Sequence, residues 1–378
     1  MKFELYPFEK LNNLLQDITP NKEYEPSVLT IGEPQFETPA FIQKALCQNT
    51  DLLKKYPKTA GEESLRKAQI DFVAKRFGVE LNNEQIIPTF GTREILFNFP
   101  QFFLFNKKEP TIAFSNPFYQ IYEGAAIASR AKTIYLNLTQ QNGFKPELDE
   151  EKLSACHLVI LNFPNNPTAS TLTLEELSEW VKLALKYNFV LLNDECYSEI
   201  YTGNTIPSLL EASLLVGNRE FKNILVVNSI SKRSSAPGLR SGFIAGDVEI
   251  LKEYLNYRTY LGCASPLPLQ SAAAAAWSDE KHVEEARAIY KQNFEAAHEI
   301  LGVEIPDATF YIWLRVSNAL EFTKKLYLQY NVKVLPGEYL ARDDENGLNP
   351  GKDFIRIALV EDPQKTKNAL KRIKECLS

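Results

Sequence analysis

The sequence predicts an α/β protein with a large domain on a seven-stranded, mostly parallel sheet and a smaller α+β domain. Two observations support this expectation. From about residue 86 to residue 245, short apolar runs alternate with segments of helical periodicity, as in strands joined by crossover helices. After about residue 275, the pattern changes to long, charged amphipathic helices with few strands, which indicates a separate region.

The expected strands are the apolar runs of the first region. Several are continuously apolar and β-branched instead of alternating, which is typical of strands buried on both faces of a sheet. Segments such as 174–186 lie between them, with apolar residues at i, i+3 and i+4 spacing. The seven runs are 86–90, 111–116, 133–138, 158–163, 189–194, 224–229 and 241–245.

The second region is expected to contain helices at 284–301 and 319–330 and strands at 310–314, 333–335 and 354–359. Residues 1–35 mix helix and loop signals that are compatible with packing on either part. We therefore assign residues 36–275 to the large domain, and residues 1–35 together with 276–378 to the small domain.

Composition excludes several classes of function. The 42 basic and 48 acidic residues give a net charge of −6, which argues against non-specific nucleic-acid binding. The five cysteines form no CxxC pair and the three histidines no HExxH motif, so we expect no metal site. The first residues lack an apolar leader, and no window reaches 18 consecutive apolar residues. These features predict a cytoplasmic protein that does not bind membranes.

Polar residues gather just after the expected strands, where open α/β sheets bind their ligands. The first group, Gly91, Thr92 and Arg93, opens a helix. The free N–H groups at such a helix start suit an anion such as a phosphate. An ordinary N-cap by Thr92 would explain the same residues.

Later strands are followed by further candidates. Tyr119 suits stacking on a flat ring or packing in the core, and Asn166 suits a fixed donor or a turn. Asp194 closes a buried strand, where a carboxylate needs a cationic partner unless it caps the next segment. Beside Arg233, the ammonium of Lys232 should be disfavoured, and a neutral amine suits Schiff-base chemistry. A solvated lysine in a basic loop is the alternative.

Taken in strand order, these residues resemble the fold-type I pyridoxal-phosphate enzymes, specifically the class I/II aminotransferases. The most specific element is the Ser-x-Ser-Lys run at 229–232, followed by Gly-x-Arg-x-Gly at 238–242. Asn-Pro-Thr at 166–168 and Asp-x-x-Tyr at 194–197 add to it. The resemblance extends from Ile-Gly-Glu-Pro at 31–34 to Phe-Ile-Arg-Ile at 354–357.

The resemblance implies pyridoxal 5'-phosphate as the cofactor and a homodimer with shared active sites. It implies that Lys232 binds the cofactor and moves the substrate's α-proton, with Asp194 and Tyr197 as further catalytic residues. Arg356 would bind the substrate's α-carboxylate near Gly32 and Asn166. The implied cofactor-binding residues are Gly91, Thr92, Arg93, Tyr119, Asn166, Asp194, Tyr197, Ser229, Ser231, Lys232, Arg240 and Tyr56 of the partner subunit.

The run at 231–242 and Tyr-Arg-Thr-Tyr at 257–260 look like the N-succinyldiaminopimelate aminotransferases of lysine and peptidoglycan precursor synthesis. This resemblance implies ping-pong exchange between L-glutamate/2-oxoglutarate and N-succinyl-L,L-diaminopimelate. Arg93, Arg233 and Arg258 are candidates for binding the extra carboxylates, although Arg233 and Arg258 fit structural ion pairs equally well. Two positions depart from the family pattern: Ala169 replaces a usual glycine, and Arg93 stands where many relatives have lysine.

Two alternatives to this assignment remain open at the level of sequence, and two others are disfavoured. An aspartate, aromatic or broad-specificity aminotransferase would keep every cofactor residue, and a β-eliminating C–S lyase would share Lys232 and Asp194. A ligand-sensing regulator would need a DNA-binding domain ahead of Gly32, where only 31 residues stand. A dinucleotide-binding enzyme is disfavoured because no GxGxxG motif follows a strand.

Overall fold

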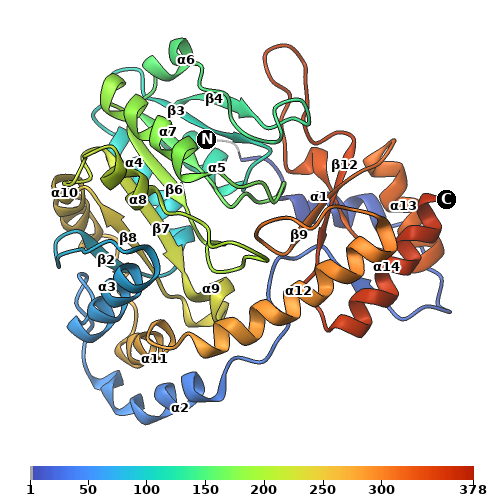
Figure 1. Cartoon of the computed structure of the whole chain (residues 1–378), viewed down its shortest axis with the longest axis horizontal. Coiled ribbons are helices and arrows are strands. Elements are labelled where there is room, and N and C mark those ends of the chain that lie inside the picture. The colour runs from blue at the N-terminus through green and yellow to red at the C-terminus, as the bar shows by residue number, and fades with distance from the viewer. Residues whose placement is uncertain (1–2) are drawn as a thin grey trace.

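The computed structural model describes residues 3–378 and is built around a seven-stranded sheet (Figure 1). The strand order is β2-β8-β7-β6-β5-β3-β4, and all neighbours are parallel except β8, which is antiparallel to β2 and β7. The strands are β2 (Ile86–Thr89), β3 (Thr111–Asn116), β4 (Lys132–Asn137), β5 (Leu158–Leu161), β6 (Val190–Asp194), β7 (Ile224–Ser229) and β8 (Gly242–Gly246).

Both faces of this sheet are buried, which explains the continuously apolar strands. Along β5, for example, Val159 and Leu161 join one hydrophobic cluster, whereas Leu158 and Ile160 join the other. One face packs against α3 (Glu63–Phe77), α7 (Leu174–Tyr187), α8 (Leu209–Leu215) and α11 (Leu267–Trp277). The other packs against α4 (Thr92–Leu104), α5 (Ile121–Ala128) and α10 (Val248–Arg258).

The remaining segments of this region are short. Helix α2 (Ala40–Gln48) and the 3-10 turn η1 (Thr50–Lys54) pack on α11. Helix α6 (Glu150–Ser154) precedes β5, and α9 (Ile230–Arg233) and the turn η2 (Pro237–Leu239) connect β7 to β8.

The long helix α12 (Lys281–Leu301) leads away from α11 toward the C-terminal part of the molecule (Figure 1). There, β11 (Leu335–Pro336), β12 (Phe354–Ala358) and β9 (Tyr311–Arg315) form an antiparallel sheet. Helices α13 (Ala319–Tyr330) and α14 (Pro363–Leu377) pack on it, and η3 (Gly337–Tyr339) follows β11.

The N-terminal segment joins this C-terminal part. Strand β1 (Ser27–Val28) pairs in parallel with β10 (Val332–Lys333), and α1 (Pro7–Leu15) packs against α13 and β11. The predicted α/β architecture is therefore confirmed, with a seven-stranded, mostly parallel sheet and an α+β part. The domain boundaries at 35/36 and 275/276 remain a prediction. Within residues 3–378, no helix has the length and apolar character needed to cross a membrane.

Candidate active site

A cavity of about 950 Å³ lies at the ends of the central strands and reaches the α+β part. Its walls come from segments that follow β2, β3, β5, β6 and β7, together with the N-terminal segment and strands β9, β11 and β12. Of the residues expected at a site, the cavity is lined by Gly32, Thr92, Arg93, Tyr119, Asn166, Asp194, Tyr197, Ser229, Ser231, Lys232, Arg240 and Arg356. The fold therefore brings together residues that are up to 324 positions apart, from Gly32 to Arg356.

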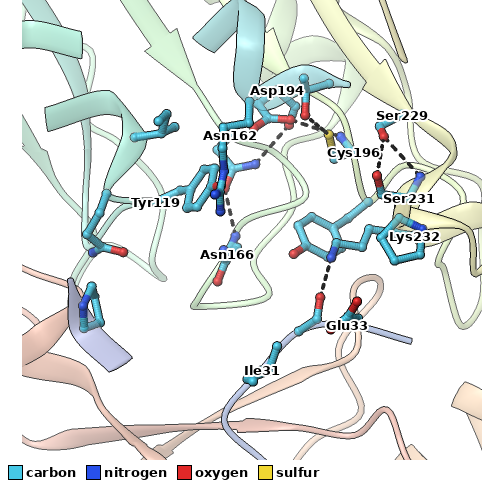
Figure 2. A pocket seen from close by; sticks show the side chains of 18 of the residues that line it. Ile31, Glu33, Tyr119, Asn162, Asn166, Asp194, Cys196, Ser229, Ser231 and Lys232 are labelled. Atoms are coloured by element: carbon cyan, nitrogen blue, oxygen red, sulfur yellow. Dashed lines mark hydrogen bonds between the residues drawn. The ribbon is translucent and has the colours of Figure 1, made fainter. Parts of the chain in front are cut away.

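Lys232 lies on the single turn α9, and its ammonium nitrogen Nζ donates a hydrogen bond to the carbonyl oxygen of Gly32 (Figure 2). Burial lowers the pKa of Lys232 to about 8, with Arg356 and Arg93 acting in the same direction and Glu33 opposing them. With this pKa, roughly a tenth of the amine is neutral at pH 7, far more than for an ordinary lysine, and a neutral amine is the nucleophilic form.

Asp194 is the last residue of β6 and is buried. Its Oδ2 accepts a hydrogen bond from the Tyr122 hydroxyl at 2.8 Å, and its Oδ1 accepts one from the Cys196 N–H at 3.3 Å. Burial raises its pKa, although these hydrogen bonds oppose the shift. Asp194 forms no ion pair within residues 3–378, so a protonated ring nitrogen in the cavity would supply the cation that a buried carboxylate needs.

Hydroxyl groups and one guanidinium line another part of the cavity. The Ser231 N–H donates to Ser229 Oγ at 3.1 Å, and the two hydroxyl oxygens are 2.8 Å apart. Arg240 donates to the carbonyl of Phe90 at 3.2 Å. Gly91 has φ +78°, and a Cβ there would lie 2.3 Å from Arg240 Nη2, so glycine lets the guanidinium approach the start of α4. These donors fit a phosphate.

Arg356 on β12 is buried and held in place from two sides. Its Nη1 donates to Asn166 Oδ1 at 2.7 Å, and its Nη2 donates to the Thr30 carbonyl at 2.6 Å. Its Nε has no partner within residues 3–378. The guanidinium also lies 4.5 Å from the Tyr311 ring centre. A fixed, incompletely satisfied guanidinium is suited to binding a carboxylate.

Two tyrosines complete the walls. Arg93 Nε donates to the Tyr119 hydroxyl at 2.7 Å, and burial raises the pKa of Tyr119. The hydroxyl of Tyr197 lies 3.0 Å from that of Tyr311 and remains protonated, because burial raises its pKa well above the usual value.

The structure corrects the expectation that Arg233 and Arg258 bind substrate, since neither lines the cavity. Both side chains are fully buried. Arg233 pairs with Glu280 at 2.6 Å, and Arg258 forms a two-bond pair with Glu94 at 3.0 Å for each bond. The ion-pair interpretation is therefore the correct one.

Tyr56 and Ala169, two further positions singled out in the sequence, differ in where the structure places them. Tyr56 is 99% exposed and does not line the cavity of its own chain, so its role in a partner's site remains a prediction. Ala169 adopts φ +62°, the conformation expected of the glycine that it replaces. A left-handed alanine costs about 1–2 kcal/mol, so surrounding contacts hold this loop in place.

Sequence reasoning missed residues that orient the others. Asn162 Nδ2 donates to the Asp194 carbonyl at 3.0 Å, and its Oδ1 accepts from the Asn166 N–H at 3.0 Å (Figure 2). Tyr122 binds Asp194, and Cys196 Sγ lies 3.2 Å from the Thr92 hydroxyl. Asn162 stands at a strand end in the sequence, which was an available signal. The contact of Tyr122 with Asp194 joins residues 72 positions apart, so it could not be inferred.

An amine of lowered pKa, a buried carboxylate and a donor-lined pocket on a mostly parallel sheet together define a pyridoxal-phosphate-dependent enzyme of the α/β type. The family comparison specifies it further: the model of aminotransferase class I and II matches residues 26–373, and the chain belongs to this family. The cofactor of these enzymes is pyridoxal 5'-phosphate, and the donor set of the cavity fits it.

Known proteins resemble the chain over its whole length. The structure of aminotransferase AspB from Helicobacter pylori 26695 is 52% identical, with a TM-score of 0.96, and the match covers 100% of this chain and 99% of that one. An aminotransferase structure from Neisseria meningitidis Z2491 is 41% identical, with a TM-score of 0.95 and coverage of 100% and 98%. The LL-diaminopimelate aminotransferase of Natranaerobius thermophilus is 30% identical over 388 residues, covering 99% of this chain and 97% of that protein.

Proposed function

We propose that this aminotransferase exchanges the amino group between L-glutamate/2-oxoglutarate and N-succinyl-L,L-diaminopimelate. The observation that carries the proposal is a further guanidinium in the cavity, that of Arg93, which lies on a different element from Arg356 and is separate from Arg240 of the proposed phosphate pocket. Within residues 3–378, the Nη1 and Nη2 atoms of Arg93 donate no hydrogen bond, since only Nε binds Tyr119. With Arg356 engaging the α-carboxylate, Arg93 is available for a carboxylate at the far end of the substrate.

The chemistry depends on four side chains in this proposal. When bound, pyridoxal 5'-phosphate supplies the carbonyl carbon that takes the amino group and the ring that accepts electrons from the substrate's Cα–H bond. Asp194 holds a proton on the ring nitrogen by charge complementarity. The neutral amine of Lys232 would take the proton from the substrate's Cα and deliver it to the carbon on the other side of the transferred nitrogen. Arg356, fixed by Asn166 and Thr30, orients the α-carboxylate so that the Cα–H bond faces Lys232.

The other wall residues position the cofactor in this proposal. Gly91, Thr92, Ser229, Ser231 and Arg240 hold its phosphate. Asn166 and Tyr197 would donate hydrogen bonds to its phenolic oxygen, and the ring of Tyr119 would stack on the cofactor ring.

A second candidate substrate class is favoured by Glu33, whose carboxylate also lines the cavity. A free ammonium at the distal end, as in LL-diaminopimelate, would pair with Glu33, whereas succinylation removes that charge. The relative from Natranaerobius thermophilus is named for this substrate. An aspartate, aromatic or broad-specificity aminotransferase is the remaining alternative.

The deciding experiment compares amino donors with the purified holoenzyme. N-succinyl-L,L-diaminopimelate, LL-diaminopimelate, aspartate and phenylalanine are each offered with 2-oxoglutarate, and glutamate is detected. We expect kcat/KM to be at least about tenfold higher for the succinylated donor, which corresponds to about 1.4 kcal/mol of selective binding. A higher value for LL-diaminopimelate, or equal turnover of aspartate or phenylalanine, would assign the enzyme to the corresponding alternative.

The role of Arg93 is tested by Arg93→Met, with Arg219→Met at an exposed position outside the cavity as the matched control. Loss of a charged hydrogen bond is worth about 1.5–3 kcal/mol, so kcat/KM for the succinylated donor should fall about 10- to 100-fold. Arg219→Met should be unchanged. A similar loss for phenylalanine, which has no distal carboxylate, would mean that Arg93 serves the cofactor instead.

A further inference from the structure

The turn that carries Lys232 is too short to hold its own position. Helix α9 has four residues (Ile230–Arg233), and the N–H of Ser234 closes it onto the Ile230 carbonyl at 2.9 Å. An isolated turn is unstable because forming it restricts several residues for a single hydrogen bond. Contacts from outside α9 must therefore fix the orientation of Lys232.

The next residue, Arg233, supplies most of these contacts on the side away from the cavity. Its guanidinium donates to the Ala276 carbonyl at 2.7 Å, to the Asp279 carbonyl at 3.3 Å and to Glu280 Oε1 at 2.6 Å. The rings of Phe72 and Trp277 lie 4.9 and 5.2 Å from it. All three hydrogen bonds go to residues 276–280, at the end of α11 and the connection that enters α12.

Ser234 adds a second connection to the same place. Its hydroxyl lies 2.9 Å from His282 Nε2, and His282 Nδ1 lies 2.5 Å from Asp279 Oδ1. Burial lowers the pKa of His282, so the ring is neutral near pH 7. Because a carboxylate only accepts, Nδ1 carries the proton and Nε2 accepts from Ser234. The charged groups around this connection are Arg233, Glu280, Asp279, Glu199, Arg287 and Glu285.

The same helix α12 also contacts the segment directly after the strand that carries Arg356. Asn293 of α12 is buried, and its Nδ2 donates to the carbonyls of Leu359 at 3.1 Å and Glu361 at 2.9 Å. Leu359 follows directly after β12, which ends at Ala358. Helix α12 therefore binds the neighbours of Lys232 at its start and the end of the Arg356 strand near its middle (Figure 1).

We propose that Arg233, Ser234, Glu280 and His282 are positioning residues that hold Lys232 against the start of α12 and couple it to the strand bearing Arg356. None of the four lines the active-site cavity, so they act through Lys232 and not on the substrate. This inference rests on the role proposed for Lys232. It also explains why an arginine follows Lys232: Arg233 anchors the turn instead of lowering the pKa of Lys232.

The test removes one of the anchoring side chains and measures how the holoenzyme's turnover and the titration of its cofactor change. Glu280→Ala deletes the carboxylate, Glu280→Gln keeps an acceptor for Arg233, and His282→Gln perturbs only the Ser234 connection. Glu284→Ala is the matched control, because Glu284 lies on the first turn of α12, is exposed and is not one of the charged groups around Arg233 and His282. The readouts are kcat and KM for one donor, and the pH midpoint of the visible absorption of the cofactor held by Lys232.

For Glu280→Ala we expect kcat to fall about tenfold with KM within about twofold, since small misplacement of a reacting group affects turnover first. The absorption midpoint should shift by about half a pH unit. Glu280→Gln should restore most of kcat, His282→Gln should fall between the two, and Glu284→Ala should match the wild type.

Several results would contradict the proposal that these residues position Lys232. A folded Glu280→Ala enzyme with unchanged kcat and midpoint would overturn the coupling, and so would losses that Glu280→Gln does not relieve. If Glu280→Ala does not fold, an unchanged midpoint in His282→Gln decides against the proposal. Lys232→Ala tests the proposed role of Lys232 separately from the role of its anchors. If this variant keeps the visible absorption of the wild-type holoenzyme, the proposed role of Lys232 is wrong.

Discussion

Lys232 and Arg233 are neighbours in the sequence, yet their side chains serve opposite sides of the same turn. The sequence suggested that Arg233 would lower the pKa of Lys232 by charge repulsion. In the structure, burial is the largest cause, and the contributing arginines are Arg356 and Arg93, which share the cavity. Arg233 instead neutralises Glu280 in the protein interior. Charge effects follow distance in space and dielectric surroundings, and sequence adjacency determines neither.

At the same scale, Tyr122→Phe tests how Asp194 is kept ionised. The Tyr122 hydroxyl makes a shorter hydrogen bond to the Asp194 carboxylate (2.8 Å) than the Cys196 N–H does (3.3 Å), and its loss should raise the pKa of that carboxyl further. A net hydrogen bond to a charged group is worth about 1.5 kcal/mol or more, so the cofactor's Kd should rise roughly tenfold. Titration of the apoprotein with cofactor measures this. Tyr135→Phe is the control, because Tyr135 packs on Phe114 and Phe118 outside the cavity, and its result should equal the wild type.

At the scale of elements, the sequence predicts the strands well because burial on both faces imposes a continuous apolar run. Strands β3 and β7 and helix α13 were predicted at their observed bounds, and the other five strands of the large sheet lie within a few residues of the expected runs. Partners across elements were not predictable. The pairing of Arg258 with Glu94 joins α10 to α4 across 164 positions, and nothing local to either residue indicates it.

The loop between β2 and α4 provides a prediction about the phosphate pocket. Gly91→Ala would place a Cβ 2.3 Å from Arg240 Nη2, so the guanidinium must move and the cofactor's Kd should rise at least about tenfold. Gly78→Ala is the matched control, since Gly78 also has a positive φ (+64°) but no atom within 4 Å of the added Cβ. Both variants should lose about 1 kcal/mol of stability, and only Gly91→Ala should lose affinity. Equal affinities would place the phosphate elsewhere.

The start of helix α8 provides a pH-dependent prediction. Glu195 is buried and accepts hydrogen bonds from the Leu209 N–H at 2.8 Å, Ser208 Oγ at 3.2 Å and Asn193 Nδ2 at 3.2 Å. Burial nevertheless raises its pKa to about 8, from 4.5. Between these values the folded state binds more protons than the unfolded state, so this group's contribution to stability falls as pH rises.

Glu195→Gln carries no such titration, so it should gain stability relative to the wild type between pH 5 and pH 8.5. The change should amount to a few kcal/mol, at about 1.4 kcal/mol for each pKa unit. Urea unfolding of both proteins at the two pH values measures it, because the other titrating groups cancel in the difference. A difference that is the same at both pH values would show that the Glu195 carboxyl ionises normally.

At the scale of the whole molecule, the cavity collects its walls from both parts of the chain, and the active site therefore depends on their relative placement. Phe118 N–H donates to the Leu340 carbonyl at 2.9 Å, and Arg342 forms a two-bond pair with Glu123 at 2.8 and 2.6 Å. These contacts join the loop after β11 to the segment after β3. Lys232 and Asp194 on one part and Arg356 on the other therefore line the same cavity.

Tyr56 is 99% exposed and does not line the cavity of its own chain, and the family resemblance implies that it reaches the phosphate of a partner's site. We therefore expect a homodimer of about twice the 43.0-kDa chain mass by light scattering. Tyr56→Phe should raise the cofactor's Kd about tenfold through the loss of one hydrogen bond to an anion.

Mixing Tyr56→Phe chains with Lys232→Ala chains, followed by subunit exchange, tests directly whether the two subunits share their active sites. In the mixed dimer, one site combines an intact Lys232 with an intact Tyr56, so wild-type affinity should return at that site. If the mixture binds no more tightly than Tyr56→Phe alone, or if the protein is a monomer, the two sites do not share this residue.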